Sequence, residues 1–438
     1  MNDYQLAYEM FTVPNKLGKK ILYFPLAGIL IDANDSLIDL LYHFEEKELV
    51  NLTSEEKKEL EYLIEKGLIT KKGDGQFLNP VTKNEIPYKL TLFPTNSCNL
   101  ECTYCYAAKT HSKPLIMNWE IVESAVEYYI NLMLQQNKTI FNLELHGGGE
   151  PFYEWNLVQR TITYIEEICC NNNFKLDAVS STNGILSTNQ LEWIVKHFSF
   201  ILVSFEVLPD IQNKQRPFEN QKPSFYAVDK TIKYFDKTGF SYGIRITVTA
   251  NNENLLKETI DFVIENYKAN LIFFEPVNIC GNNQNAREVD LNKFIENFIL
   301  LETYAEQKGI KIRYSGADIE KLSSNFCYAG TAQFAITPEG YLTNCWEVTD
   351  MKHPLANIFI FGEIKSNGQL EINKEKQNFL QSLKVQNFKY CQNCFAKWHC
   401  AGDCLARLYD DGFENSRGNA RCKTNREILA YKLLQTLK

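Results

Sequence analysis

The stretch SCNLECTYCYA, residues 97–107, places Cys98, Cys102 and Cys105 in the spacing C-x3-C-x2-C. It follows a short β-rich run, YKLTLFPT (88–95), so we expect the cysteines on a loop at the carboxyl end of a strand. Three thiolates leave one iron of a four-iron cluster open to an external ligand, whereas structural zinc sites usually recruit a fourth protein ligand. The spacing therefore favours an iron–sulfur cluster with an open position, and a zinc half-site that is completed elsewhere in the chain is the alternative.

Further β-rich runs follow along the chain, and a longer amphipathic stretch comes after each of them. This alternation predicts an α/β fold with a parallel sheet and helices outside it, because parallel strands need crossover connections. Together with the first run they suit a partial (β/α)6 barrel, with active-site residues at the carboxyl ends of the strands. The runs are NLELHGGG (142–149), DAVSSTNG (177–184), FILVSFEV (200–207), YGIRITVTA (242–250) and NLIFFEPV (270–277).

The second run ends in HGGGEP, residues 146–151. Glycine lets backbone carbonyls approach a bound ammonium group, and Glu150 adds a compensating carboxylate. Together with the three cysteines, this stretch resembles the radical S-adenosylmethionine (SAM) superfamily. In that family the cysteine motif holds a [4Fe-4S] cluster, and the amino and carboxylate groups of SAM complete its coordination. The resemblance thus implies SAM as a cofactor and a radical SAM barrel.

The same resemblance implies SAM contacts around the barrel. Tyr104 matches the aromatic position beside the third cysteine, and Arg216 offers a guanidinium for the SAM carboxylate. Related enzymes often read S-x-D-G after the fourth strand, whereas this chain reads SFEV at 204–207. For Asn183, Ser204 and Arg216, turn capping or a surface ion pair is an equal alternative. The implied SAM-binding residues are Tyr104, Gly147, Gly148, Gly149, Glu150, Pro151, Asn183, Ser204 and Arg216.

Seven of the thirteen cysteines fall late in the chain, in the pattern C-x12-G-x4-C, then C-x2-C-x5-C-x3-C, then C. Such clustering in a reducing compartment points to metal rather than disulfides. The pattern closely resembles the SPASM domain, which binds two auxiliary [4Fe-4S] clusters. The resemblance implies one cluster on Cys327, Cys345 and Cys404, and the other on Cys391, Cys394, Cys400 and Cys422.

This ligand set is one short, because two four-iron clusters need eight ligands. The first auxiliary cluster then keeps an open iron that Cys280, water or a substrate thiolate could fill. Structural zinc is the alternative for such cysteine pairs. The segment AQFAITPEGYLTNCW (332–346) predicts a hairpin that turns at Gly340 and brings Cys327 and Cys345 together.

The N-terminal part predicts a small module with an apolar run at 21–31 and helices at 35–44 and 53–69, the second capped by Ser54. This order resembles the winged-helix-like precursor-peptide recognition element of peptide-modifying enzymes, which binds a leader peptide as an added edge strand. A cap that merely covers the barrel is the alternative. We expect a recognition domain at 1–87, the barrel at 88–310 and the SPASM domain at 311–438.

The composition of the chain limits the kinds of partner that we expect it to bind. A net charge of -8 and a pI near 5.5 argue against a nucleic-acid surface, which needs clustered Lys and Arg. No apolar run is long enough to span a membrane, and the start MNDYQLAYEMF lacks the pattern of a secretion signal. We therefore expect a cytoplasmic protein.

The resemblances together imply a radical SAM maturase of ribosomally made peptides. It would cleave SAM to a 5′-deoxyadenosyl radical and install a thioether or another crosslink. Its partners would be a precursor peptide with a leader and an electron donor such as flavodoxin or ferredoxin. An anaerobic sulfatase maturase that forms formylglycine is one alternative, although some 90 residues precede Cys98 here. A non-catalytic zinc-binding, peptide-docking protein is another.

Overall fold

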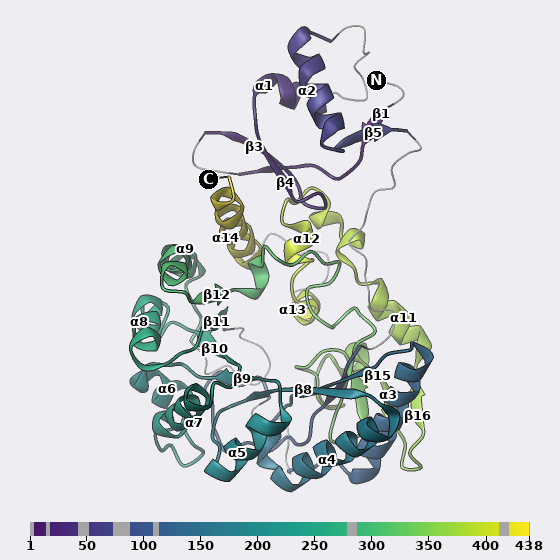
Figure 1. Ribbon diagram of the computed structural model, residues 1–438, viewed down its shortest axis with the longest axis vertical. Coiled ribbons are helices and arrows are strands. Elements are labelled where there is room, and N and C mark those ends of the chain that lie inside the picture. Colours follow the sequence, from purple (N-terminus) through teal and green to yellow (C-terminus); the bar gives the residue numbers. More distant parts are fainter. Residues whose placement is uncertain are drawn as a thin grey trace.

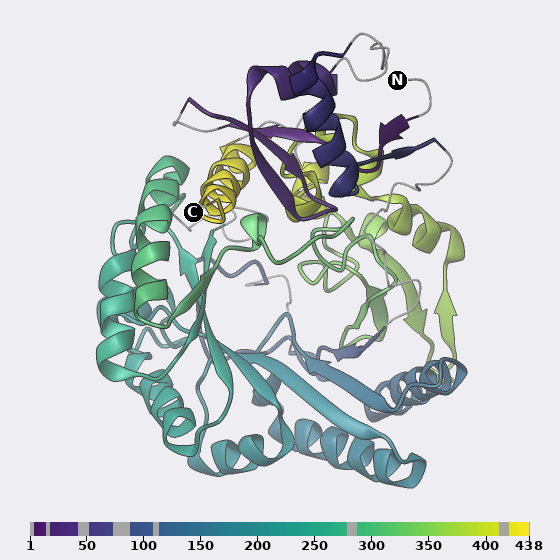
Figure 2. The same ribbon diagram turned by 45° about the horizontal axis from the view of Figure 1, so that its top comes forward.

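One long sheet, with strand order β12-β11-β10-β9-β8-β7-β6-β13-β14-β15-β16, dominates the computed structural model. The strands from β12 to β6 are parallel. Figures 1 and 2 show this parallel part curving into an open barrel with helices on its outer face. The structure describes residues 4–14, 18–42, 52–72, 88–107, 114–277, 287–410 and 420–437.

All the barrel strands expected from the sequence are confirmed. One further parallel strand, β12 (Lys311–Arg313), pairs with β11 and carries the sheet past the expected boundary at 310. It was missed because three residues are too short to display an alternating pattern. The expected strands are β6 (Leu90–Leu92), β7 (Ile140–Leu145), β8 (Lys175–Thr182), β9 (Phe200–Ser204), β10 (Tyr242–Val248) and β11 (Leu271–Pro276).

Alternation along each strand decides which side chains enter the barrel. In β10, Ile244 and Ile246 are buried in the apolar core, while Arg245 between them is exposed. Ile244 and Ile246 therefore lie on the face of the sheet that packs in the apolar core, and Arg245 lies on the other face, which lines the barrel interior. The flanking helices are α3 (Trp119–Gln135), α4 (Trp155–Asn172), α5 (Thr188–His197), α6 (Pro209–Gln215), α7 (Phe225–Thr238), α8 (Leu256–Asn266) and α9 (Leu291–Gln307).

The C-terminal part extends the same sheet. The expected hairpin is confirmed as β13 (Ala335–Ile336) and β14 (Tyr341–Thr343), and β13 pairs in parallel with β6. Gly340 turns it at a φ of +92°, a conformation that favours glycine. The other elements are β15 (Ile360–Ile364), β16 (Leu370–Ile372), α10 (Ala356–Phe359), α11 (Lys374–Ser382), α12 (Lys397–Cys400), α13 (Leu405–Asp410) and α14 (Ala420–Gln435), with short 3-10 turns at Pro151–Tyr153, Ser315–Ala317, Val385–Asn387 and Lys389–Cys391.

In the N-terminal unit the expected apolar run forms a hairpin of two antiparallel strands, and the two expected helices follow it, together with strands that were not expected. Its sheets are β2-β3-β4 and β1-β5. The second helix is capped by Thr53 rather than Ser54, because Thr53 is extended and exchanges hydrogen bonds with Glu56 in a capping box. The elements are β1 (Tyr4–Leu6), β2 (Phe11–Val13), β3 (Lys20–Phe24), β4 (Ile29–Ala33), α1 (Asp35–Tyr42), α2 (Ser54–Glu65) and β5 (Ile69–Lys71). The expected linker at 73–87 lies outside the described residues.

The N-terminal unit is seated on α12. Glu9 accepts hydrogen bonds from Lys397 Nζ at 2.6 Å and from Trp398 Nε1 at 2.8 Å. The Tyr23 hydroxyl lies 2.6 Å from His399 Nε2. Residues that precede Cys400 thus form the seat, and Figure 1 shows the unit above this helix.

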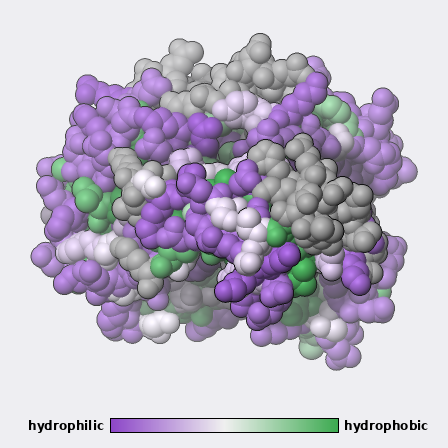
Figure 3. All heavy atoms as spheres, turned by 90° about the horizontal axis from the view of Figure 1, so that it is seen from above, coloured by the Kyte–Doolittle hydropathy of each residue, from purple (hydrophilic) through white to green (hydrophobic). Residues whose placement is uncertain are grey.

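The surface viewed from the N-terminal side is mostly hydrophilic, with hydrophobic side chains in small separate patches (Figure 3). Across the described ranges, every helix falls short of the length or the apolar composition that crossing a bilayer requires.

Candidate active site at the carboxyl ends of the barrel strands

The loop that carries the first three cysteines follows β6 and is held by the segment after α6. Glu101 N–H donates to the Pro217 carbonyl at 2.8 Å, and Thr103 N–H donates to the Gln215 carbonyl at 2.9 Å. Within the loop, Cys105 N–H donates to the Cys102 carbonyl at 3.2 Å. Backbone hydrogen bonds to a distant segment therefore fix the loop at the mouth of the barrel.

Burial controls the ionisation of these thiols. It raises the pKa of Cys98 to about 12 and the pKa of Cys102 to about 12. The Asn183 side-chain amide lies 3.6 Å from Cys98 Sγ and acts in the opposite direction. Thiolates would form here only beside a strong positive charge, which a bound metal centre provides. The donor set and its surroundings fit the implied iron–sulfur cluster.

The glycine stretch packs directly on the cysteine loop. Glu150 N–H donates to the Ser97 carbonyl at 2.8 Å. A Cβ on Gly149 would lie 2.3 Å from that same carbonyl oxygen. A Cβ on Gly147 would meet only ordinary contacts, at 3.4 Å and beyond. Gly149 is therefore required for the close approach of the two loops, whereas Gly147 has room beside it.

The Glu150 carboxylate ties the end of β7 to the end of β8. It accepts hydrogen bonds from Thr182 Oγ1 at 2.8 Å, Asn183 N at 2.6 Å and Phe152 N at 3.2 Å. Burial raises the pKa of Glu150, and these donors oppose that shift. Pro151 begins the short 3-10 turn that follows. In this structure the carboxylate joins the glycine stretch to the Asn183 loop.

Tyr104 and Arg216 lie together around a carboxylate that the sequence analysis did not single out. Arg216 Nη1 donates to the Tyr104 hydroxyl at 2.6 Å, and that hydroxyl donates to Glu206. Burial raises the pKa of Glu206 to about 7, against the lowering effect of Arg216. Arg216 Nε is buried and has no hydrogen-bond partner among the described residues. This orphaned donor fits an absent anionic group, such as the SAM carboxylate.

The fourth strand departs from the S-x-D-G pattern in sequence but keeps one of its conformational demands. Val207 stands where that pattern has glycine and adopts a φ of +67°, which a β-branched residue rarely does. Ser204 ends β9 half-buried and pairs in register with Arg245 of β10. Glu206 stands where that pattern has aspartate, but its contact with Tyr104, which is far away in the sequence, becomes visible only in the structure.

Three of the late cysteines, Cys327, Cys345 and Cys404, lie close together, and we call them cysteine group I. Burial, followed by the charge of Cys404, raises the pKa of Cys327 to about 12. The same two causes, with Cys327, raise the pKa of Cys345. Cys345 follows β14, and its N–H donates to Thr343 Oγ1 at 3.3 Å. The strand pairing of β14 thus positions one thiol of the group.

Cys391, Cys394, Cys400 and Cys422 form cysteine group II. Burial and then Asp403 raise the pKa of Cys400, and Cys422 and Cys391 add to that shift. Cys422 also raises the pKa of Cys394, after burial. The Asn425 amide donates to Cys400 Sγ at 3.2 Å. The assignment of these two sets to two auxiliary clusters stays a prediction. In the part of the chain described, no three His, Cys, Asp or Glu side chains close around a single metal ion. Cys280 lies outside that part.

Comparisons with known proteins bear on this arrangement. A model of the radical SAM superfamily matches residues 92–263, which include the first cysteine loop and the glycine stretch. The radical SAM cyclopropyl synthase TigE of Paramaledivibacter caminithermalis is 23% identical over 464 residues, covering 96% of this chain and 88% of TigE. The chain is a radical SAM enzyme. It uses SAM and a [4Fe-4S] cluster, and it is related to peptide maturases.

Other relatives match the radical SAM enzyme over shorter stretches. The cysteine-type anaerobic sulfatase-maturating enzyme of Clostridium perfringens is 25% identical over 376 residues, 79% of this chain and 96% of that enzyme. The uncharacterized protein MJ0907 of Methanocaldococcus jannaschii is 30% identical over 179 residues, 40% of this chain. The chain spans only 58% of the length of MJ0907.

Solved structures show the same fold. Native anSMEcpe with bound AdoMet has a TM-score of 0.63 and 19% identity, covering 80% of this chain and 98% of that one. Streptococcus suis SuiB bound to precursor peptide SuiA has a TM-score of 0.56 and 15% identity, covering 96% of this chain and 100% of SuiB. The fold of this radical SAM enzyme therefore matches SuiB over nearly its whole length.

Proposed function

We propose that this radical SAM enzyme is a maturase that installs a thioether or another crosslink in a ribosomally made precursor peptide. The observation that carries the proposal is the seating of the N-terminal unit on α12 through Glu9 and Tyr23. A leader peptide bound to that unit would be held beside the C-terminal cysteines. The likeness to SuiB, whose complex contains the precursor peptide SuiA, supports this role.

In this proposal Cys98, Cys102 and Cys105 hold the SAM-binding cluster. When bound, the cluster supplies the electron that cleaves SAM to methionine and a 5′-deoxyadenosyl radical, which abstracts hydrogen from the peptide. Arg216 binds the SAM carboxylate through its orphaned Nε, and Tyr104 and Glu206 hold the guanidinium in place. Gly147, Gly148 and Gly149 bind the amino group of SAM in this proposal, and Pro151, Asn183 and Ser204 line the same SAM site.

Cysteine groups I and II hold the two auxiliary [4Fe-4S] clusters in this proposal. Burial raises the pKa of Cys345, Cys394 and Cys400, as expected of thiols that ionise on metal binding. Group I would supply three thiolates, so that one iron would be left for another ligand. The auxiliary cluster held there would supply an acceptor for the electron that the modified residue loses, and a flavodoxin or ferredoxin would supply electrons to the enzyme.

A second candidate function is the maturation of a sulfatase by formylglycine formation. The match that covers 96% of the Clostridium perfringens sulfatase-maturating enzyme favours it. The two functions differ in what the N-terminal unit does, because only a leader-guided maturase needs a docking module for a second peptide segment.

The test begins with anaerobically purified protein, its iron and sulfide content, and dithionite-dependent formation of 5′-deoxyadenosine from SAM. About twelve irons per chain with turnover would support three clusters, and about four would remove the auxiliary ones. Each short peptide encoded beside the gene, and the Cp18Cys peptide bound by anSMEcpe, would then be tested by mass spectrometry, both for the loss of two hydrogens that a crosslink causes and for the exchange of sulfur for oxygen that formylglycine formation at cysteine causes. Modification of Cp18Cys alone would favour the second candidate, and zinc without turnover would rule out both.

A further inference from the structure

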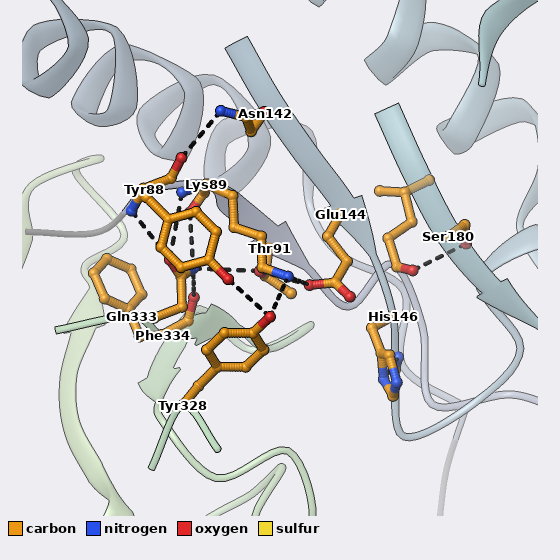
Figure 4. A network of polar contacts seen from close by, with 12 residues as sticks. Tyr88, Lys89, Thr91, Asn142, Glu144, His146, Ser180, Tyr328, Gln333 and Phe334 are labelled. Atoms are coloured by element: carbon orange, nitrogen blue, oxygen red, sulfur yellow. Dashed lines mark hydrogen bonds and ion pairs between the residues drawn. The ribbon is translucent and has the colours of Figure 1, made fainter. Parts of the chain in front are cut away.

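A buried ion pair joins the first two barrel strands. Lys89, directly before β6, pairs through Nζ with the Glu144 carboxylate of β7, and their side chains are only 10% and 13% exposed (Figure 4). Glu144 faces the barrel interior, because Leu143 and Leu145 on either side of it lie in the apolar core. Burial raises the pKa of Glu144, and Lys89 opposes that shift. Burying two charges is costly, so this pair calls for a role beyond packing.

The other side of the Lys89 ammonium faces aromatic rings. Lys89 Nζ donates to the Tyr328 hydroxyl at 3.0 Å and lies 4.5 Å from the centre of that ring. It lies 5.4 Å from the centre of the Trp346 ring. The Tyr88 hydroxyl donates to the Tyr328 hydroxyl at 2.8 Å. The positive end of the ion pair is therefore turned toward Tyr328 (Figure 4) and toward the Trp346 ring.

These two aromatic residues lead directly to cysteine group I. Tyr328 follows Cys327 and Trp346 follows Cys345 in the sequence. Their rings are tilted by 34° to each other, with centroids 4.9 Å apart. The Lys89 ammonium thus contacts Tyr328 and Trp346, which are the sequence neighbours of the group I cysteines Cys327 and Cys345.

The same aromatic pair reaches the glycine stretch. The Trp346 ring lies 4.6 Å from the His146 ring, centre to centre. His146 Nδ1 accepts the Gly147 N–H at 2.9 Å. Burial, together with Arg245 and Lys89, lowers the pKa of His146 to about 3, so the imidazole is neutral. Arg245 and Lys89 are therefore the charged side chains that act on this ring, and Lys89 also contacts the rings of Tyr328 and Trp346.

The backbone of Lys89 is fixed as firmly as its side chain. Gln333 Oε1 accepts from Tyr88 N at 3.2 Å and from Lys89 N at 3.4 Å. Gln333 Nε2 donates to the Lys89 carbonyl at 2.8 Å. Because Gln333 belongs to the segment that enters β13, the hairpin that ends near Cys345 also holds Lys89.

We propose that the Lys89–Glu144 pair sets the reduction potential of the cluster that cysteine group I would hold. The inference rests on the proposed function only in requiring that this cluster exists. A positive charge near a cluster stabilises the reduced, more negative form and raises the potential, and a negative charge lowers it. Lys89 acts as a positioning residue that makes the cluster a better electron acceptor, and Glu144 limits that effect.

Because Lys89 and Glu144 carry opposite charges, removing one or the other should shift the midpoint potential of the cluster in opposite directions. Lys89→Met leaves Glu144 and should lower the midpoint potential, whereas Glu144→Gln leaves Lys89 uncompensated and should raise it. The double variant should fall between them, and Lys89→Arg should restore the wild-type value. The midpoint would be measured by electron paramagnetic resonance during redox titration of the full chain, reconstituted with iron and sulfide. Replacing Cys98, Cys102 and Cys105 by alanine in every variant silences the SAM-binding cluster.

The matched control is the exposed pair Lys233–Asp229 on α7, where Lys233→Met should leave the midpoint unchanged. The signal from group II serves as a second control, and Cys400→Ala identifies it. Shifts of the same sign in Lys89→Met and Glu144→Gln, or no shift at normal iron content, would overturn the inference and leave the proposed function standing. If the cluster variant lacks iron at group I altogether, the inference falls together with the auxiliary cluster that the proposed function assigns to this group.

Discussion

The backbone of Gly149 lies so close to the Ser97 carbonyl oxygen that a Cβ on this glycine would sit 2.3 Å from it. Atoms do not approach that closely, and the obstacle is backbone rather than a movable side chain. The contact joins the glycine stretch after β7 to the loop that begins at Cys98. Any side chain at Gly149 must therefore push the two halves of the SAM site apart.

Gly149→Ala should destabilise the protein by about 1–3 kcal/mol and reduce occupancy of the SAM-binding cluster, because the cysteine loop must move. Thermal unfolding and iron content of the anaerobic protein measure the two effects. Gly147→Ala is the matched control for stability, since a Cβ there meets only ordinary contacts. Equal unfolding temperatures for both variants would contradict the steric account.

Glu206 should give the stability of the protein a distinct pH dependence. Burial raises its pKa from 4.5 to about 7 in the folded chain, so the folded state keeps a proton that the unfolded state has lost. The stabilisation is full below about 4.5 and is lost as the pH rises through about 7. Glu206→Gln should flatten the change in unfolding temperature over this window. An unchanged slope in Glu206→Gln would show that another group titrates there.

Removing Glu9 should loosen the N-terminal unit. The Lys397 side chain is 2% exposed, so Glu9→Ala leaves a buried ammonium without its carboxylate, at a cost on the order of 2 kcal/mol. Hydrogen exchange should rise in β2 and β3 while the barrel strands stay protected. Glu65→Ala, an exposed change on α2, is the control. If both variants exchange alike, the unit is held by other contacts.

Single cysteine changes should separate the two groups. Cys404→Ala should remove the cluster of group I, and Cys394→Ala should remove that of group II, each lowering iron by about four per chain. Different resonance signals should disappear in the two variants. Cys170→Ala, at an exposed thiol on α4, should keep all the iron. Loss of the same signal in both variants would mean that the groups share one cluster.

Much of the barrel could be predicted because its strands are five to eight residues long, or continue into informative loops, as in FPTNSC after β6. Of the strands that were missed, β1, β2, β5, β12 and β16 have three residues each, and β15 has five. The pair β1–β5 joins residues near 5 and 70, so no local pattern marks it. Long-range pairing, not propensity, makes these strands.

The residues of the candidate site likewise fall into those that a local motif predicts and those that depend on contacts between distant parts of the chain. Cysteine and glycine motifs are short and local, so spacing alone brings out their chemistry. Glu206 becomes informative only when Tyr104 is placed beside it, and Lys89 only when Tyr328 is. The capping position was misjudged by one residue because Thr53 and Ser54 are both good caps, and the backbone angles decide between them.

The pairing of β13 with β6 also constrains how the protein can be made. Leu92 of β6 lies beside Leu145 on one side and Ile336 on the other. During synthesis the second neighbour emerges long after the first, so one edge of β6 stays open until most of the chain has left the ribosome. A truncated barrel would carry that open edge permanently, and the first cysteine loop would grow from an unfinished strand. Assembly of the reactive centre is thereby tied to completion of the polypeptide.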